Sequence, residues 1–317
     1  MQPISCFKSI AHLFLSRKSR CGIYLLVFSD RTVYIGQANN VVLRFAQHRR
    51  RYKAIAGFCF LPEKKTRLNE TERLLIHRAE SSGLALRNFV HTSQVVGETD
   101  LDLVISPEKQ YAWLANPERF NRKESSAHRL SMPASYLARF SDQFHAFQDE
   151  PASAFATRIL RRYVVGCIPA PVMTEYSFWA VSCLPATNRP YWPRLACISM
   201  AMMETFVVGH FKNNPKELWA LIVVGRKTLF EAFGGQRRFS ELFPRITLKR
   251  RGHRDAGPDQ VTLHAWSAAD LREIIENGKI RHAAAELALR VMRKRATIYG
   301  KFHCKQLADY VLNGECT

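Results

Sequence analysis

Five side chains in the first quarter of the chain have the types and the spacing needed to hydrolyse a phosphodiester bond. Tyr24 and Tyr34 lie ten residues apart, Arg44 follows after ten more, His48 comes four later, and Glu72 lies further on. This hydrolysis needs an activated water, a cation for the developing negative charge and a proton source for the leaving oxygen. Phenols, an imidazole, a guanidinium and a metal-binding carboxylate can meet those needs together.

The order of these residues resembles the GIY-YIG nuclease family. The matching segments are, in chain order, Gly22-Ile23-Tyr24, Tyr34-Ile35-Gly36, Arg44, the stretch 68–76 with Glu72 in register, and Asn88. Glu70 does not fit that register. The resemblance covers about residues 20–91, and each tripeptide alone would be a weak signal. The ordered set predicts a metal-dependent DNA endonuclease.

The resemblance and the chemistry together assign roles. Glu72 would hold one hard divalent ion, Mg²⁺ or Mn²⁺. Arg44 would grip two phosphate oxygens with its planar fork. Tyr24 is the candidate general base, and we expect Arg44 to lower its pKa from the usual ~10. His48 could share the proton transfer, and Tyr34 would position the water or bind the phosphate.

Three features of the match need comment. Gln37 stands where some family members carry a lysine after the second tripeptide. The interval from Glu72 to Asn88 is long, so Asn88 could bind nucleic acid or could only hold a loop. Gly22 and Gly36 are expected to serve backbone geometry.

The elements that would position these residues follow the order β-β-α-β-α. Apolar runs at 22–28 and 31–36 flank a polar turn and predict a hairpin. A helix should begin after Asn39 or Asn40, a third strand should cover 52–61, and a second helix should cover 69–80. We therefore predict an α+β fold, an α/β sandwich whose N-terminal module has a small antiparallel three-stranded sheet flanked by helices.

The length of 317 residues fits two domains better than one. Residues 1–96 would be the nuclease domain, and Pro107, Pro117 and Pro133 mark 97–149 as a linker with a connecting helix at 134–148. Residues 150–317 would form a mixed β-rich and helical domain that selects the target or binds a protein partner.

The second domain shows strand-like and helix-like segments. The strand-like ones are 161–168, 175–184, 196–211, 218–224 and 260–266. The helix-like ones are 267–277, 281–296 and 303–313. Residues 245–260 are expected to be an exposed basic loop.

Basic clusters suggest where nucleic acid would bind, although each could also be a solvated surface. The first follows the candidate site and contains Arg49, Arg50, Arg51 and Lys53. The second is Lys249, Arg250 and Arg251 in the expected loop. The third, Arg290, Arg293 and Lys294, would form one face of a helix that follows phosphates.

The formal net charge is +20, and the excess of Lys and Arg lies mainly in the first and last thirds. Such an excess favours a polyanionic partner, which we take to be DNA. The eight cysteines form no CxxC pair and the chain has no apolar run of ~20 residues, so we expect no structural zinc, no membrane partner and a cytoplasmic, reducing location.

Some alternatives stay open. A double-strand break would require a homodimer or two successive nicks, because one active site cuts one strand at a time. The setting could be repair, restriction, phage defence or a mobile element. The main competing hypothesis is a nucleic-acid-binding protein whose nuclease-like module no longer cuts, and RNA is a third candidate substrate.

Overall fold

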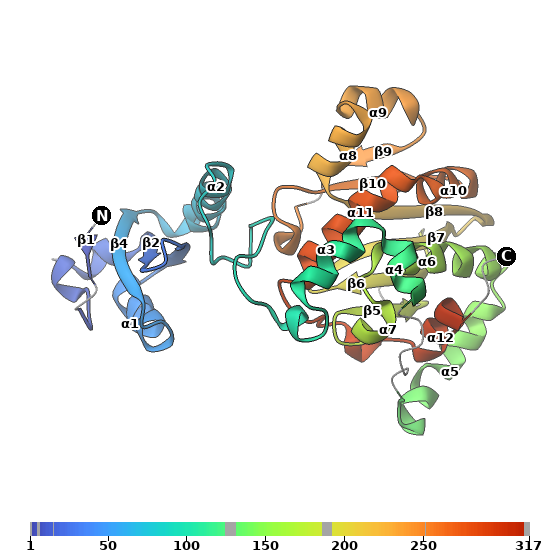
Figure 1. Cartoon of the computed structure of the whole chain (residues 1–317), viewed down its shortest axis with the longest axis horizontal. Helices are drawn as coiled ribbons and strands as arrows, with labels where there is room; N and C mark the ends of the chain where they lie inside the picture. The colour runs from blue at the N-terminus through green and yellow to red at the C-terminus, as the bar shows by residue number, and fades with distance from the viewer. Residues whose placement is uncertain are drawn as a thin grey trace. The chain divides into compact units, whose positions relative to one another are not determined.

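The computed structural model describes residues 2–4, 7–14, 16–123, 131–185, 192–250 and 252–313. The chain divides into two compact units, Met1–Gly97 and Glu98–Thr317. Each unit has its own antiparallel sheet and its own hydrophobic core (Figure 1). The predicted α+β class is therefore confirmed.

The sheet of the first unit has the strand order β1-β4-β2-β3. Its strands are β1 (Gln2–Pro3), β2 (Gly22–Phe28), β3 (Val33–Ala38) and β4 (Ile55–Pro62). The predicted order β-β-α-β-α is confirmed, with helices α1 (Val41–Arg51) and α2 (Leu68–Ser81). The three predicted strands are confirmed as β2, β3 and β4, and the two-residue strand β1 pairs with β4 at the edge of the sheet. β1 was not predicted because two residues are too few to show an alternating pattern.

Alternate residues of β2 pack against different helices. Tyr24 and Phe28 share a buried cluster with Phe45 of α1, whereas Ile23 shares a cluster with Ile76 of α2. The side-chain period of two in a strand produces this division. The first unit is thus a sheet between two helical layers, and the face that each side chain takes is set by its place in β2 or β3.

The second unit contains a six-stranded antiparallel sheet with the order β5-β6-β7-β8-β10-β9. Its strands are β5 (Trp179–Cys183), β6 (Arg194–Met200), β7 (Met203–Phe211), β8 (Asn214–Val224), β9 (Thr247–Lys249) and β10 (Val261–Ala265). Helices α6 (Ser153–Cys167), α10 (Ala268–Glu276) and α11 (Gly278–Met292) pack on the sheet, while α5 (Ala134–Gln148) and α12 (Lys305–Asn313) lie beside β5 (Figure 1). In the described ranges no helix is both long enough and apolar enough to cross a bilayer.

The strand predicted at 161–168 is wrong, because these residues form the last turns of α6. Its β-branched and aromatic composition indicated a strand. The buried positions Leu160, Tyr163, Val164 and Cys167, however, continue at the spacing of three to four that is typical of a helix face. The run predicted at 196–211 forms two strands, β6 and β7, with a turn at Ala201 and Met202. The other strand predictions and the three C-terminal helices are confirmed.

The prediction of a linker at 97–149 is also wrong, since all of it after Gly97 belongs to the second unit. Trp113 and Phe147 lie fully buried in its core. The prolines were misinterpreted: Pro107 and Pro117 are the first residues of helices α3 (Pro107–Ala115) and α4 (Pro117–Lys123). Proline is favoured at that position because its fixed φ suits a helix start. The helix predicted at 134–148 is confirmed as α5.

Candidate active site

The hydroxyl of Tyr24 is the centre of a polar cluster on the α1 side of the first sheet. It lies 2.7 Å from Nε2 of His48, and Nε of Arg44 donates a hydrogen bond to it at 3.4 Å. Tyr24 is 2% exposed and His48 is 8% exposed, whereas Arg44 is exposed. The cluster thus joins a buried phenol–imidazole pair to a guanidinium that solvent can reach.

Gly36 makes room for the Tyr24 ring. The two residues are partners in the β2–β3 pairing, and a Cβ built on Gly36 would lie 2.4 Å from the Tyr24 hydroxyl oxygen. Gly22 is equally crowded, because its Cβ would lie 2.2 Å from the carbonyl oxygen of Leu61. Neither glycine has a positive φ. Each glycine thus has a structural role, because it lets a neighbouring group approach the backbone closely.

Helix α1 places Arg44 and His48 one turn apart, so that both reach the same phenol. Asn40 caps the helix, as predicted, and its side chain accepts hydrogen bonds from the amides of Val42 and Leu43. Residues four apart lie on one helical face. The cap therefore fixes where the helix starts and thereby which side chains face Tyr24.

Tyr34 lies beside this cluster and is half-buried. Its ring centroid is 5.0 Å from that of His48 and 6.1 Å from that of Tyr24. Burial raises the pKa of Tyr34, the positive charge of Arg44 opposes this rise, and the negative charge of Glu72 adds to it. Glu72 therefore lies close enough to act electrostatically on this phenol.

Glu72 approaches from α2, on the other side of edge strand β3. Its Oε2 accepts a hydrogen bond of 2.8 Å from the amide of Gln37, which also donates to Oδ1 of Asn69 at 2.6 Å. Gln37 comes three residues after Tyr34, so the two side chains lie on opposite faces of β3. The structure thus gathers Tyr24, Tyr34, Arg44 and His48 on one face of the sheet and holds Glu72 at the edge strand, within electrostatic range of Tyr34.

Burial controls the protonation of the Tyr24–His48 pair. It is the main reason that the pKa of Tyr24 is raised, and the hydrogen bond and charge of Arg44 lower it only in part. The expectation that Arg44 would bring this pKa below its usual value is therefore wrong. Burial, with the charges of Arg44 and Arg51, lowers the pKa of His48 to about 4. Both groups are accordingly neutral at pH 7.

The residues around Glu72 suit a weakly chelated divalent ion. Among the described residues no three or more His, Cys, Asp or Glu side chains gather as a metal cage. Mg²⁺ does not need such a cage, because it keeps several waters and binds through one or two carboxylates and substrate phosphates. Glu72 is half-buried at the edge strand, and Gln37 orients its carboxylate. The donor set therefore fits Mg²⁺ or Mn²⁺ with water and phosphate as the other ligands.

Comparisons of the chain with family models, with curated proteins and with solved structures give no match. The chemistry of this site must accordingly be argued from its own residues.

The basic run after His48 is only partly directed to solvent. Nη1 of Arg49 donates to the carbonyl oxygens of Ile55 at 2.9 Å and Lys53 at 3.4 Å, which ties the end of α1 to β4. Arg50, Arg51 and Lys53 are exposed. Of the four residues predicted to grip phosphates, Arg49 thus has a structural role and the other three can reach a ligand.

Asn88 holds the chain against β3. It is 5% exposed, its Oδ1 accepts from the amide of Ile35 at 3.0 Å, and its Nδ2 donates to the carbonyl of Ile35 at 2.7 Å. This amide therefore acts as an extension of the sheet. Of the two roles left open for Asn88, the structure favours holding the chain and corrects the assignment to nucleic acid.

The basic helix predicted at residues 290–294 does not present its charges to solvent. Arg290 forms ion pairs with Glu286 at 2.6 Å and Asp259 at 3.2 Å. Arg293 lies 3.8 Å from Asp102, and Lys294 is 5% exposed. The assignment of Arg293 and Lys294 to nucleic-acid binding is therefore wrong, because both residues, just after the end of α11, are turned into the second unit. The sequence could not show that because the acidic partner Asp102 lies far away in the chain.

The predicted basic loop at 245–260 is partly ordered into strand β9, which pairs with β10. Asp255 and Gln260 are buried, so the expectation of a wholly exposed loop is wrong. Lys249 and Arg250 are exposed, and Arg251 lies outside the described residues. Lys249 and Arg250 thus stay candidates for contact with nucleic acid.

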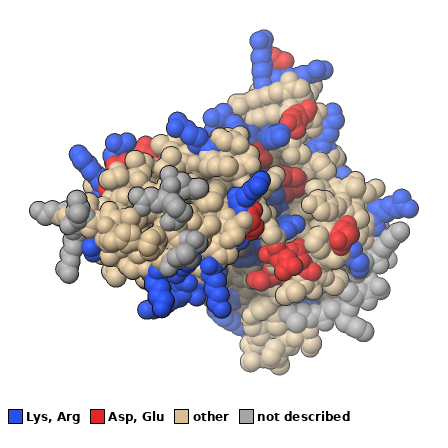
Figure 2. Space-filling view, turned by 60° about the vertical axis from the view of Figure 1, so that its left-hand side comes forward, with Lys and Arg blue, Asp and Glu red and all other residues tan. Residues whose placement is uncertain are grey.

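A second basic surface beside β9 was missed by the sequence analysis. Helices α8 (Arg226–Phe233) and α9 (Gln236–Leu242) are joined by Gly234 and Gly235, both with positive φ. The exposed cations of this lobe are Lys227, Arg237 and Arg238. α9 lies at the top of Figure 1, and blue side chains project there in Figure 2. The pair Gly234-Gly235 was the one sequence feature that could have indicated a break between two short helices here.

Proposed function

We propose that the first unit is a GIY-YIG-type, divalent-metal-dependent DNA endonuclease and that the second unit directs it to its substrate. The observation that carries this proposal is the buried hydrogen bond between Tyr24 and His48, with Arg44 bonded to the same phenol oxygen. Its residues match, in type and order, those that the sequence motif predicts for a phosphodiester-cleaving site. The phenols, the guanidinium, the imidazole and the carboxylate that the proposed reaction needs are all present in this sequence.

In this proposal Tyr24 and His48 act as one proton acceptor. Both groups are neutral at pH 7, and the proposal requires the His48 tautomer that carries its proton on Nδ1, so that the Tyr24 hydroxyl donates to Nε2. As a water attacks phosphorus, its proton passes to the Tyr24 oxygen and the phenol proton moves to His48. A new bond forms between the water oxygen and phosphorus, the bond to the 3′ oxygen breaks, and that leaving oxygen takes a proton from solvent. Tyr24 is thereby never required to become a buried phenolate.

Substrate binding would improve this acceptor. The charge of Arg44 is one cause of the low pKa of His48. A phosphate bound by Arg44 offsets that charge, so the pKa of His48 rises toward its ordinary value near 6.5. Glu72 would hold the divalent ion, which when bound polarises the phosphate and stabilises the charge on the leaving oxygen. Gln37 orients the Glu72 carboxylate that would hold this ion.

The charge of the molecule and its exposed cations favour a polyanionic substrate, for which we propose DNA. Arg50, Arg51 and Lys53 follow the site in the first unit, and Lys249 and Arg250 lie with the α8–α9 lobe in the second. Such cations bind phosphates without reading the sequence. Together they account for binding, whereas the selection of a target needs a further contact.

A cleavage assay tests the proposal. Supercoiled plasmid incubated with the full chain and Mg²⁺ should become nicked or linear, and chelation of the metal should prevent this. Tyr24→Phe and Glu72→Gln should both abolish cleavage and leave DNA binding intact. Tight binding without any cleavage would instead support the silent nuclease-like module, and preferential cutting of a matched RNA would reassign the substrate.

A further inference from the structure

The second unit contains a cavity that the cleavage site does not use. Its volume is about 490 Å³, which is within the range of small-molecule sites. It lies between the strands β5, β6 and β7, the helix α5 and the segment that includes the 3-10 turn Gly300–Phe302. All of its lining residues belong to the second unit, so it can be considered without reference to the nuclease module.

The floor of the cavity is flat because the strands place small side chains there. Ala180 and Ser182 come from β5, and their pairing partners Ser199 and Cys197 come from β6. None of these side chains is large enough to fill the space above the sheet. The cavity therefore exists because the paired strands β5 and β6 carry small side chains at these positions.

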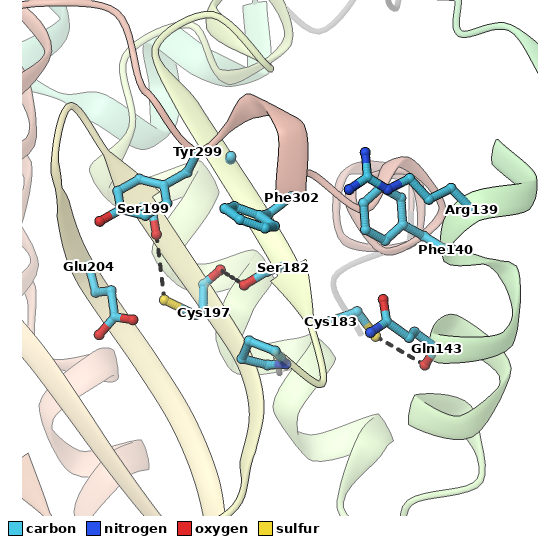
Figure 3. A pocket seen from close by; sticks show the side chains of 12 residues that line it. Arg139, Phe140, Gln143, Ser182, Cys183, Cys197, Ser199, Glu204, Tyr299 and Phe302 are labelled. Carbon is cyan, nitrogen blue, oxygen red and sulfur yellow. Dashed lines mark hydrogen bonds between the residues drawn. The ribbon is translucent and has the colours of Figure 1, made fainter. Parts of the chain in front are cut away.

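The walls are aromatic. Phe302 and Tyr299 stand on one side and Phe140 of α5 stands on the other. Figure 3 shows the Phe302 ring between Tyr299 and the α5 side chains. Phe302 is 44% exposed, so a ligand that stacks on it would cover apolar surface now facing solvent. A flat ring fits such a space better than a saturated chain, because flat rings stack on aromatic side chains.

Polar groups are placed at the edge of this space. Ser199 is 5% exposed, and its hydroxyl lies 3.6 Å from the thiol of Cys197, which is a weak partner. Glu204 lines the same wall, where Arg194 binds its Oε1 and holds the carboxylate in place. Arg139 lies at the opposite side. The site thus offers hydroxyls and a carboxylate to a polar ring edge and a guanidinium to an anion.

We propose that this cavity binds one nucleobase that carries an exocyclic amino group, together with its phosphate. The aromatic walls would stack on the base, Glu204 would accept a hydrogen bond from its amino group, and Arg139 would contact the phosphate. A lipid chain would leave the buried Ser199 hydroxyl without a good partner, and a sugar would meet too many apolar walls. The base could come from a free nucleotide or from an unstacked position in DNA; only the second source rests on the proposed nuclease function.

Calorimetric titration of the full chain with dCMP, dAMP and dTMP tests the cavity directly. We expect dCMP or dAMP to bind at least about tenfold more tightly than dTMP, since dTMP lacks the amino group. Phe302→Ala should weaken binding at least about tenfold through loss of stacking. Tyr310→Ala removes a ring of similar exposure outside the cavity, at 48% against 44%, and should have no effect.

Two further variants allow the proposal to be tested even if Phe302→Ala folds poorly. Ser182→Leu fills the cavity from its floor and should abolish nucleotide binding without lowering the unfolding temperature. Glu204→Gln should remove the preference for the amino-bearing base. Absence of nucleotide binding to the folded wild-type chain would overturn the proposal, and equal binding of dTMP would overturn the role of Glu204.

A duplex that contains 2-aminopurine identifies the source of the base. If the base enters the cavity from DNA, its fluorescence should rise on binding, and Ser182→Leu should prevent the rise. Nucleotide binding with no fluorescence change would assign the cavity to a free nucleotide. Glu72→Gln should cleave no DNA and should still give the fluorescence change. The cleavage assay thus tests the nuclease proposal, and the fluorescence tests base binding in the cavity.

Discussion

Nε2 of His48 lies 2.7 Å from the hydroxyl oxygen of Tyr24, and the two residues come from a helix and a strand that pack against each other. Burial raises the pKa of the phenol and lowers that of the imidazole. The pair is therefore neutral, and it can accept a proton from water only by passing one along to His48. The following predictions depend on this relationship and on the residues around it.

Tyr24→Phe should lower the rate of plasmid nicking by at least about 100-fold, because no proton can then reach His48 through residue 24. It should also reduce the free energy of unfolding by about 1–3 kcal/mol, since it removes the partner of a buried imidazole nitrogen. Tyr111→Phe, at a site that is 71% exposed, is the control and should change neither quantity. An unchanged nicking rate in Tyr24→Phe would exclude the phenol from the reaction.

His48 should make the first unit less stable in acid. Its pKa is about 4 in the folded chain against 6.5 for the ordinary group, so the unfolded chain binds the proton more readily. The stabilising contribution is complete above pH 6.5 and is lost as the pH falls toward about 4, to a total of about 3 kcal/mol or less. The measurement compares unfolding of the wild type and His48→Gln across this range, because carboxylates that titrate there cancel in the difference. Parallel curves would show that His48 is not the cause.

Glu72→Gln should weaken Mn²⁺ binding by at least about tenfold and abolish metal-dependent cleavage, because an amide lacks the charge that a hard cation prefers. Electron paramagnetic resonance of Mn²⁺ measures binding without any substrate. Glu70→Gln is a matched control on the same helix, since Glu70 is exposed and lies outside the motif register. Equal effects of the two substitutions would remove Glu72 from the metal site.

Gly36→Ala should displace the Tyr24 ring, because its new methyl group would lie 2.4 Å from the phenol oxygen. We expect a loss of about 1–3 kcal/mol in stability together with a large loss of cleavage. Gly278→Ala meets no atom within 4 Å and is the control for the substitution itself. A Gly36→Ala variant with normal activity would mean that the Tyr24 position tolerates movement.

Arginines of the second unit should separate into two groups. Arg293→Ala should lower the unfolding temperature, with a loss of about 1–3 kcal/mol, since Arg293 pairs with Asp102 inside the unit. Arg237→Ala and Arg250→Ala should leave stability unchanged and weaken DNA binding, each reducing the slope of log affinity against log salt by about 0.9. The salt dependence of binding distinguishes the groups. A reduced slope for Arg293→Ala would restore its assignment to a phosphate contact.

Much of the first unit was predictable because local patterns decide it. Apolar runs on either side of a polar turn indicated β2 and β3, and Asn40 indicated the start of α1. The common face of Arg44 and His48 then followed from helical spacing alone. The same reasoning failed at 161–168, where composition indicated a strand and the period of the buried residues makes a helix. The interpretation of Pro107 and Pro117 was also wrong, because the sequence alone does not distinguish a proline at the start of a helix from a proline in a loop.

The amino-acid order by itself determined which chemical groups the first unit carries and which helix or strand holds each of them. Only the tertiary structure decided their protonation and accessibility. Burial has a larger effect on the pKa of Tyr24 than the charge of Arg44 has. The Asn88 side chain is hydrogen-bonded to the backbone of Ile35, and Arg293 pairs with Asp102. The physical reason is that desolvation and pairing depend on neighbours that lie far away in the chain, whereas periodicity and capping depend on residues a few positions apart.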